Sequence, residues 1–156
     1  MQTSFWIVPD FLKVKMIRQY KEEDLEELLD VWYQASLVAH SFLSEAFFEQ
    51  ERENIRNIYM DRAETWIYEG DGRVVAFISL AGNEVGAIFV HPDWQGKGIG
   101  RALMDLARDL RQPLELEVFT ENLKARGFYE RYGFVTVKEY LNEEFERPML
   151  RMRLEK

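Results

Sequence analysis

The spacing of apolar residues changes several times along the chain, and each change predicts a new element. Between residues 25 and 36, apolar side chains recur every three or four positions, which predicts a helix with one buried face. Residues 21–30 carry six acids and one base, and the positive end of a helix dipole favours acids at that place. A second helix is expected over residues 47–59.

Seven short runs rich in β-branched and aromatic residues predict β-strands. They lie at residues 16–20, 65–69, 74–80, 84–90, 114–118, 134–140 and 149–154. Two more helices are expected at residues 99–110 and 122–132, the second bounded by a capping Asn122 and by Gly133. Hairpin-linked strands followed by alternating strands and helices predict an α/β fold, a mixed sheet with helices on both faces.

The chain length of 156 residues corresponds to one domain. We expect a single domain over residues 16–156. Residues 1–15 are apolar, contain Pro9 and show no clear period, so they are predicted to be an N-terminal extension. The sequence leaves a monomer and a homodimer equally open.

Composition excludes several classes of function. The net charge of −8 argues against nucleic acid as a partner and is more compatible with an amine-bearing one. The absence of cysteine excludes disulfides, zinc–thiolate sites and a cysteine nucleophile, and two histidines cannot form a three-histidine metal centre. No apolar run is long enough to span a membrane and no secretory signal opens the chain, so a cytoplasmic protein is expected.

The most informative segment is Gln95-Gly96-Lys97-Gly98-Ile99-Gly100-Arg101, which follows a predicted strand and opens a predicted helix. Its three glycines allow backbone amides to approach an anion closely, and the helix amino terminus adds the positive end of its dipole. A dinucleotide fingerprint would need glycine at position 101, and the GxxxxGK[ST] phosphate loop is absent. The segment therefore predicts a phosphate cradle, with a tight glycine-rich turn as the alternative.

This segment resembles the Q/R-x-x-G-x-G/A motif of the GNAT superfamily of acyl-CoA-dependent N-acetyltransferases. The preceding Phe89-Val90-His91-Pro92 is similar to the end of that family's fourth strand. Farther along, Asn122…Ala125…Phe128-Tyr129…Gly133-Phe134 resembles its second signature. The resemblance covers residues 16–154 and implies a sheet splayed between strands four and five. Trp32…Ser36…His40-Ser41-Phe42-Leu43 is similar to a more local pattern in a bacterial subgroup.

The resemblance implies that acetyl-CoA, or another acyl-CoA, is the co-substrate and that no metal takes part. The pyrophosphate would be held by the backbone of Gln95, Gly96, Lys97, Gly98, Ile99, Gly100 and Arg101. The pantetheine arm would pair with the strand edge at Ile88, Phe89 and Val90, as an added strand does. Asn122 would contact the cofactor near the thiol, although it could also be a plain helix cap.

The resemblance also implies roles in catalysis. Tyr129 would donate a proton to the leaving thiolate, which is chemically reasonable because phenol and thiol pKa values lie close together; a core aromatic is the alternative. Glu84 would accept the proton of the amine through water, unless it is only a solvated charge. His40 and water are the other candidates for the base.

The resemblance also implies that the acceptor enters beside Trp32, Ser36, His40 and Phe42, because in the family the thioester end of the cofactor lies toward the first helices. Trp32, Ser36 and His40 are spaced by four residues, so they would share one face if the helix persists, and that face would meet either the acceptor or the core. With no cysteine and no serine elbow or triad evident, direct attack of an amine on the thioester in a ternary complex is predicted. The acceptor would be a small-molecule amine or a peptide. The alternative function is a non-catalytic acyl-CoA-binding or sensing module.

Overall fold

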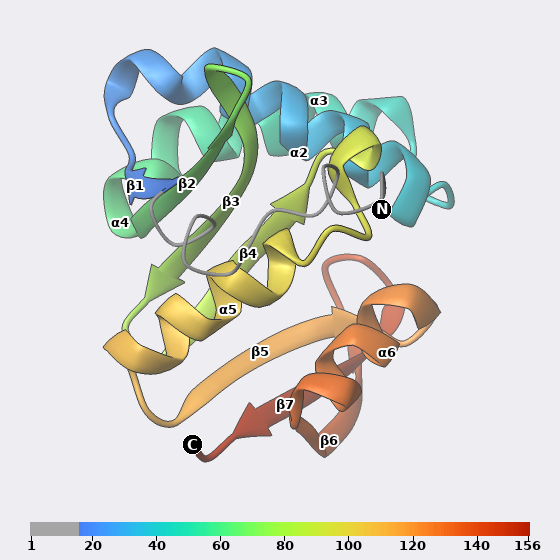
Figure 1. The fold of residues 1–156 in the computed structure, drawn as a ribbon. Coiled ribbons are helices and arrows are strands. Elements are labelled where there is room, and N and C mark those ends of the chain that lie inside the picture. The colour runs from blue at the N-terminus through green and yellow to red at the C-terminus, as the bar shows by residue number, and fades with distance from the viewer. Residues whose placement is uncertain (1–15) are drawn as a thin grey trace, which may run out of the picture.

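The computed structural model describes residues 16–156 as one mixed sheet covered by helices (Figure 1). The predicted extension at residues 1–15 lies outside the described residues. The strands follow the order β1-β2-β3-β4-β5-β7-β6 across the sheet. Their bounds are β1 Ile17–Gln19, β2 Glu64–Gly70, β3 Arg73–Ala81, β4 Glu84–Val90, β5 Leu114–Phe119, β6 Val135–Asn142 and β7 Arg147–Leu154.

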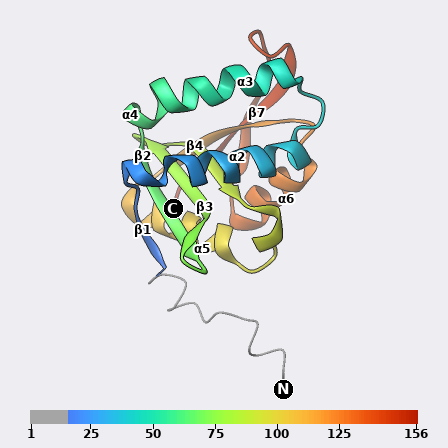
Figure 2. The same cartoon turned by 90° about the horizontal axis from the view of Figure 1, so that it is seen from above.

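Helices lie on both faces of the sheet, as the view from above shows (Figure 2). One face is covered by α2 (Leu25–Ala39) and α3 (Glu45–Asn54), and the other by α5 (Ile99–Leu110) and α6 (Leu123–Tyr132). A 3₁₀ turn precedes α2, and α3 continues through a π-helical stretch into the short α4 (Met60–Arg62). The predicted second helix therefore begins two residues early, because Ser44 caps it by accepting from the N–H of Phe47 at 3.1 Å.

Two apolar clusters, one on each face, hold the helices to the sheet. The α5 stripe enters the larger cluster through its fully buried Leu103, Met104 and Ala107. On the other face, Leu28 and Trp32 of α2 pack with Phe48 of α3 against β2, β3 and β4. These buried stripes are the physical basis of the periodicities seen in the sequence.

The sheet opens between its two central strands. β4 and β5 run parallel but share a single register pair, Glu84 with Glu115, where both strands begin. The β3–β4 ladder also shifts register between Ser79 and Leu80, which leaves Gly86 as an extra residue in β4. Beyond this point the backbone edge of β4 from Ala87 to Val90 has no partner in β5, and the strands diverge toward their carboxyl ends (Figure 1). We call this opening the splay. The predicted α/β fold, with its splay between strands four and five, is confirmed.

No helix among residues 16–156 is long and apolar enough to cross a membrane. The same residues contain no group of three histidine, aspartate or glutamate side chains that could hold a metal ion.

Candidate active site

The glycine-rich loop lies at the open end of the splay, between β4 and α5. Gly96 and Gly98 adopt left-handed backbone conformations, with φ values of 77° and 83°, which are strained for residues with a side chain. Gly98 is the residue before α5, and its carbonyl accepts the first helical hydrogen bond, from Ala102, at 3.1 Å. The amides of the first helical turn have no partner within the helix, so they are available to an anion.

Gln95 forms a bridge at the end of β4. Its Nε2 donates to the carbonyl of Val90 at 2.9 Å, and its Oε1 accepts from Lys124 of α6 at 2.6 Å. Gln95 and Val90, which were both predicted to contact the cofactor, are therefore hydrogen-bonded to each other in this structure. Lys97 lies over the Trp94 ring at 5.8 Å, and the Arg101 guanidinium lies 5.9 Å from the Tyr132 ring.

Tyr129 lies on α6, within the larger apolar cluster. Its ring packs between Phe128 and Phe134, with centroids at 5.6 Å and 5.7 Å. No residue among 16–156 hydrogen-bonds to its hydroxyl, and burial raises the pKa of Tyr129 to about 12. The hydroxyl is therefore neutral and carries its proton throughout the physiological pH range.

Asn122 caps α6 and also touches the end of α2. Its Oδ1 accepts from the N–H of Ala125 at 3.2 Å, so its role as a helix cap is real. Its Nδ2 lies 3.3 Å from Nε2 of His40, the residue that follows α2. Burial lowers the pKa of His40 below its ordinary value. This contact joins one predicted acceptor residue directly to one predicted cofactor residue.

Aromatic side chains gather around His40 where β5 ends. The rings of Phe42 and Phe119 pack edge-to-face at 5.4 Å, and Phe145 of the β6–β7 connection lies 5.5 Å from Phe119. Arg147 covers Phe42, with its guanidinium carbon 4.9 Å from the ring centre. The end of β5 is therefore lined by a half-buried aromatic cluster from three different segments.

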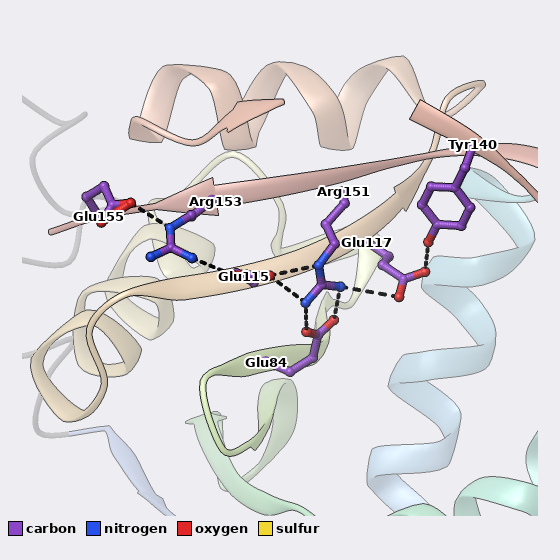
Figure 3. Close-up of polar contacts among 7 residues, drawn as sticks. All are labelled: Glu84, Glu115, Glu117, Tyr140, Arg151, Arg153 and Glu155. Atoms are coloured by element: carbon purple, nitrogen blue, oxygen red, sulfur yellow. Dashed lines mark hydrogen bonds and ion pairs between the residues drawn. The ribbon is translucent and has the colours of Figure 1, made fainter. Parts of the chain in front are cut away.

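Glu84 lies at the closed end of the splay, in a network of ion pairs (Figure 3). Both of its carboxylate oxygens accept from Arg151 of β7, at 2.6 Å and 3.2 Å. Arg151 reaches Glu84 across β5, and on β5 it also binds Glu115 at 2.7 Å and Glu117 at 3.3 Å. Burial and the carboxylate of Glu117 raise the pKa of Tyr140, which donates to that carboxylate, to about 12.

Comparison with known proteins agrees with this geometry. The family described as "Acetyltransferase (GNAT) domain" matches residues 61–136, which include β4, the glycine loop and α6. YiaC of Escherichia coli, a peptidyl-lysine N-acetyltransferase, is 31% identical over 134 residues, which are 85% of this chain and 92% of YiaC. The chain belongs to the GNAT family of acetyltransferases. The predicted activity class, an acetyl-CoA-dependent N-acetyltransferase, is thereby confirmed.

Two further comparisons support membership in the GNAT family. YjaB of Escherichia coli, also named a peptidyl-lysine N-acetyltransferase, is 33% identical over 119 residues, which are 76% of this chain and 80% of YjaB. The solution structure of apo-YjaB superposes with a TM-score of 0.79, at 28% identity, over 88% of this chain and 95% of that one.

The GNAT co-substrate fits the residues that are present. The left-handed Gly98 places the loop against the amino terminus of α5, and a Cβ built at Gly96 would meet nothing within 4 Å, so an anion has room there. At Gly100 a Cβ would already touch Phe128 of α6, at 3.5 Å. The unpartnered edge of β4 supplies backbone groups for the amides of a pantetheine arm.

The predicted acceptor residues separate into two pairs in the GNAT fold. His40 and Phe42 lie in the aromatic cluster at the end of β5. Trp32 and Ser36, in contrast, are 6% and 2% exposed, and Trp32 belongs to the apolar cluster under α2. The shared helical face that the spacing of four suggested is thus buried in the core at Trp32 and Ser36.

Sequence reasoning missed the residues that hold this GNAT sheet together at the splay, above all Arg151 and Glu117. A usable signal was present. Residues 114–118 read Leu-Glu-Leu-Glu-Val and residues 150–154 read Leu-Arg-Met-Arg-Leu. Glutamate therefore alternates with apolar residues in the first run, and arginine alternates with apolar residues in the second, both with a period of two. Antiparallel pairing of β5 with β7 brings the charged positions onto one face, where Glu117 is paired with Arg151.

Proposed function

We propose that this GNAT enzyme acetylates the side-chain amine of lysine in a peptide or protein. The observation that carries the proposal is the splay, with an anion-binding loop at its open end and the neutral hydroxyl of Tyr129 on the adjoining helix. The names of YiaC and YjaB favour lysine as the acceptor, because this chain matches at least four fifths of each relative.

Binding of the co-substrate is assigned to the backbone of β4 and of the loop. The amides of the loop from Gly96 to Arg101 bind the pyrophosphate, and the edge from Ile88 to Val90 pairs with the pantetheine arm. Gln95 keeps its bridge to Val90 and Lys124, so its role is to shape the loop. Acetyl-CoA, when bound, supplies an acetyl group activated as a thioester.

Proton transfer at the leaving sulfur is assigned to Tyr129, whose hydroxyl keeps its proton up to about pH 12. Backbone N–H groups of β4 polarise the carbonyl oxygen that gains charge in the transition state. Asn122 orients the start of α6 and contacts the co-substrate near its thiol. Direct attack by the amine within a ternary complex needs no covalent acyl-enzyme.

Removal of the amine proton is assigned to water in the splay. Glu84 remains the candidate that would relay this proton, but both of its oxygens are engaged by Arg151. An engaged carboxylate has fewer lone pairs free for an incoming proton. His40 is a weaker candidate, because its Nε2 already contacts Asn122.

The charge around the splay favours a cationic acceptor. On β5, the side chains of Glu115 and Glu117 point away from α5 and α6, and Glu84 lies beside them. Arg151 and Arg153 of β7 pair with these three acids, so the acids outnumber the bases in this network. A lysine ammonium is attracted to such a surface before it loses its proton in the splay.

The test is a thiol-release assay with acetyl-CoA and matched peptides. With an amino-terminally blocked peptide that contains lysine, the enzyme should release the free thiol of CoA. The peptide should gain one acetyl group, as measured by mass spectrometry. The same peptide with arginine in place of lysine should be inert. Turnover of small amines without turnover of any lysine peptide would overturn the acceptor assignment. Tight CoA binding without turnover of any amine would instead support the non-catalytic acyl-CoA-binding module.

A further inference from the structure

His40 lies where the acceptor side of the molecule meets the start of α6. Its backbone N–H donates to the carbonyl of Ser36 at 2.8 Å and closes α2. Its ring packs edge-to-face on Phe42 at 5.9 Å and on Phe119 at 5.1 Å. The imidazole therefore packs on β5 and on the segment that follows α2. It reaches α6 through Asn122.

The orientation of the Asn122 amide is determined by the helix that it caps. The backbone N–H of Ala125 can only donate, so the atom of Asn122 that it meets at 3.2 Å must be the carbonyl oxygen. The amide nitrogen then faces Nε2 of His40 at 3.3 Å. An amide nitrogen can only donate, so Nε2 must present a lone pair.

His40 is consequently a neutral imidazole with its proton on Nδ1. Burial supports this state, because it disfavours the charged ring. Two charged groups flank the contacts of His40: Arg147, which covers Phe42, and Glu121, the residue before Asn122. These two pair with each other at 3.2 Å, so the carboxylate of Glu121 is already engaged by a cation, and the Arg147 guanidinium disfavours an imidazolium.

We propose that His40 is a positioning residue for acetyl transfer, which accepts a hydrogen bond from Asn122 and so couples the end of α2 to the start of α6. α6 carries Tyr129 two turns later, so this contact sets the tyrosine hydroxyl relative to the acceptor side. The inference rests on the proposed roles of Asn122 and Tyr129. Protonation of His40 would place two donors against each other and open the contact, so transfer should weaken at acid pH.

The tautomer can be measured without any activity assay, by ¹⁵N NMR of the full chain. The chain has two histidines, and the other one is an internal control. Nδ1 of His91 accepts from the backbone N–H of Asp93 at 3.1 Å, so His91 must carry its proton on Nε2. We expect opposite tautomers for the two rings at neutral pH. A protonated Nε2 on His40 would overturn the inference.

Two variants test the consequence for transfer. Gln at position 40 can still accept from Asn122 but does not titrate, whereas Leu has similar bulk and no acceptor. His40→Leu should lower kcat about 5- to 10-fold, the equivalent of one hydrogen bond, with little change in KM for acetyl-CoA. His40→Gln should restore most of kcat. It should also remove the part of the fall in rate at acid pH that is caused by protonation of His40. Because the acceptor amine also titrates, wild type and His40→Gln are compared on one acceptor.

The outcomes separate the inference from the proposed function. Unchanged kcat in His40→Leu, or an identical acid limb in wild type and His40→Gln, would overturn the positioning role. If lysine peptides prove not to be acceptors, the same comparison is made with the amine that does turn over. The NMR result stands in either case, because it depends only on the folded chain.

Discussion

Replacing Tyr129 by phenylalanine should separate catalysis from folding in this enzyme. The change removes one hydroxyl and keeps the ring that packs on Phe128 and Phe134. Because no residue among 16–156 hydrogen-bonds to that hydroxyl, its loss breaks no hydrogen bond in the described part of the chain. The free energy of unfolding should therefore change by less than about 1 kcal/mol.

The effect on rate should be much larger than the effect on stability. Positioned general acids contribute roughly 10²–10⁴-fold, and a thiolate leaves fairly well without help. We therefore expect kcat to fall by about 10²-fold, which corresponds to about 2.7 kcal/mol of activation free energy. kcat/KM should fall in parallel when chemistry limits the rate, while CoA affinity stays close to that of wild type.

The pH dependence follows from the burial of Tyr129. Its pKa of about 12 in the folded state lies above the ordinary value of 10.0, so the folded state binds the proton more tightly than the unfolded chain. The corresponding stabilisation is complete below pH 10 and is lost as the pH rises through about 12. Below pH 10, ionisation of Tyr129 should therefore cause no fall in the rate.

The measurement combines steady-state thiol release, calorimetric titration with CoA and thermal unfolding. Tyr132→Phe is a matched control on the same helix, because the Tyr132 hydroxyl does donate to Asp105 of α5. This control should lose about 1 kcal/mol of stability and keep its kcat. Wild-type kcat in Tyr129→Phe would refute the reasoning and make Tyr129 a core aromatic, with water as the acid.

Three further predictions concern the loop, the ion-pair network and the amino terminus. Gly98→Val should weaken CoA binding strongly, whereas Gly72→Val, at a similar φ of 75° in the β2–β3 turn, should cost stability and leave CoA affinity unchanged in calorimetry. Arg151→Met leaves three carboxylates facing one another at partly exposed positions, so chemical denaturation should show a loss of about 1–2 kcal/mol; an unchanged midpoint would contradict the role of the network. A chain that begins at Met16 should fold and bind CoA, and failure of either would place residues 1–15 in the core.

Local pattern by itself determined most of the helices and strands and predicted candidate site residues. The helix predicted at residues 99–110 has those bounds in the structure, because its apolar stripe and the glycine before it are local signals. Asn122 and Gly133 bound α6 as predicted, since capping depends on the residues next to the cap. The glycine loop and Tyr129 were recognisable for the same reason, as each belongs to a short motif with a fixed spacing.

The tertiary structure alone decided which distant residues meet. The contact of His40 with Asn122 joins residues 82 positions apart, and that of Arg151 with Glu84 joins residues 67 positions apart. Neither follows from periodicity, because β7 enters the sheet between β5 and β6 and the β4–β5 ladder stops after one pair. Burial likewise decided that Trp32 and Ser36 pack in the core while His40, on the same spacing, reaches α6. A helical period defines a face, but only the packing of the whole chain defines what that face meets.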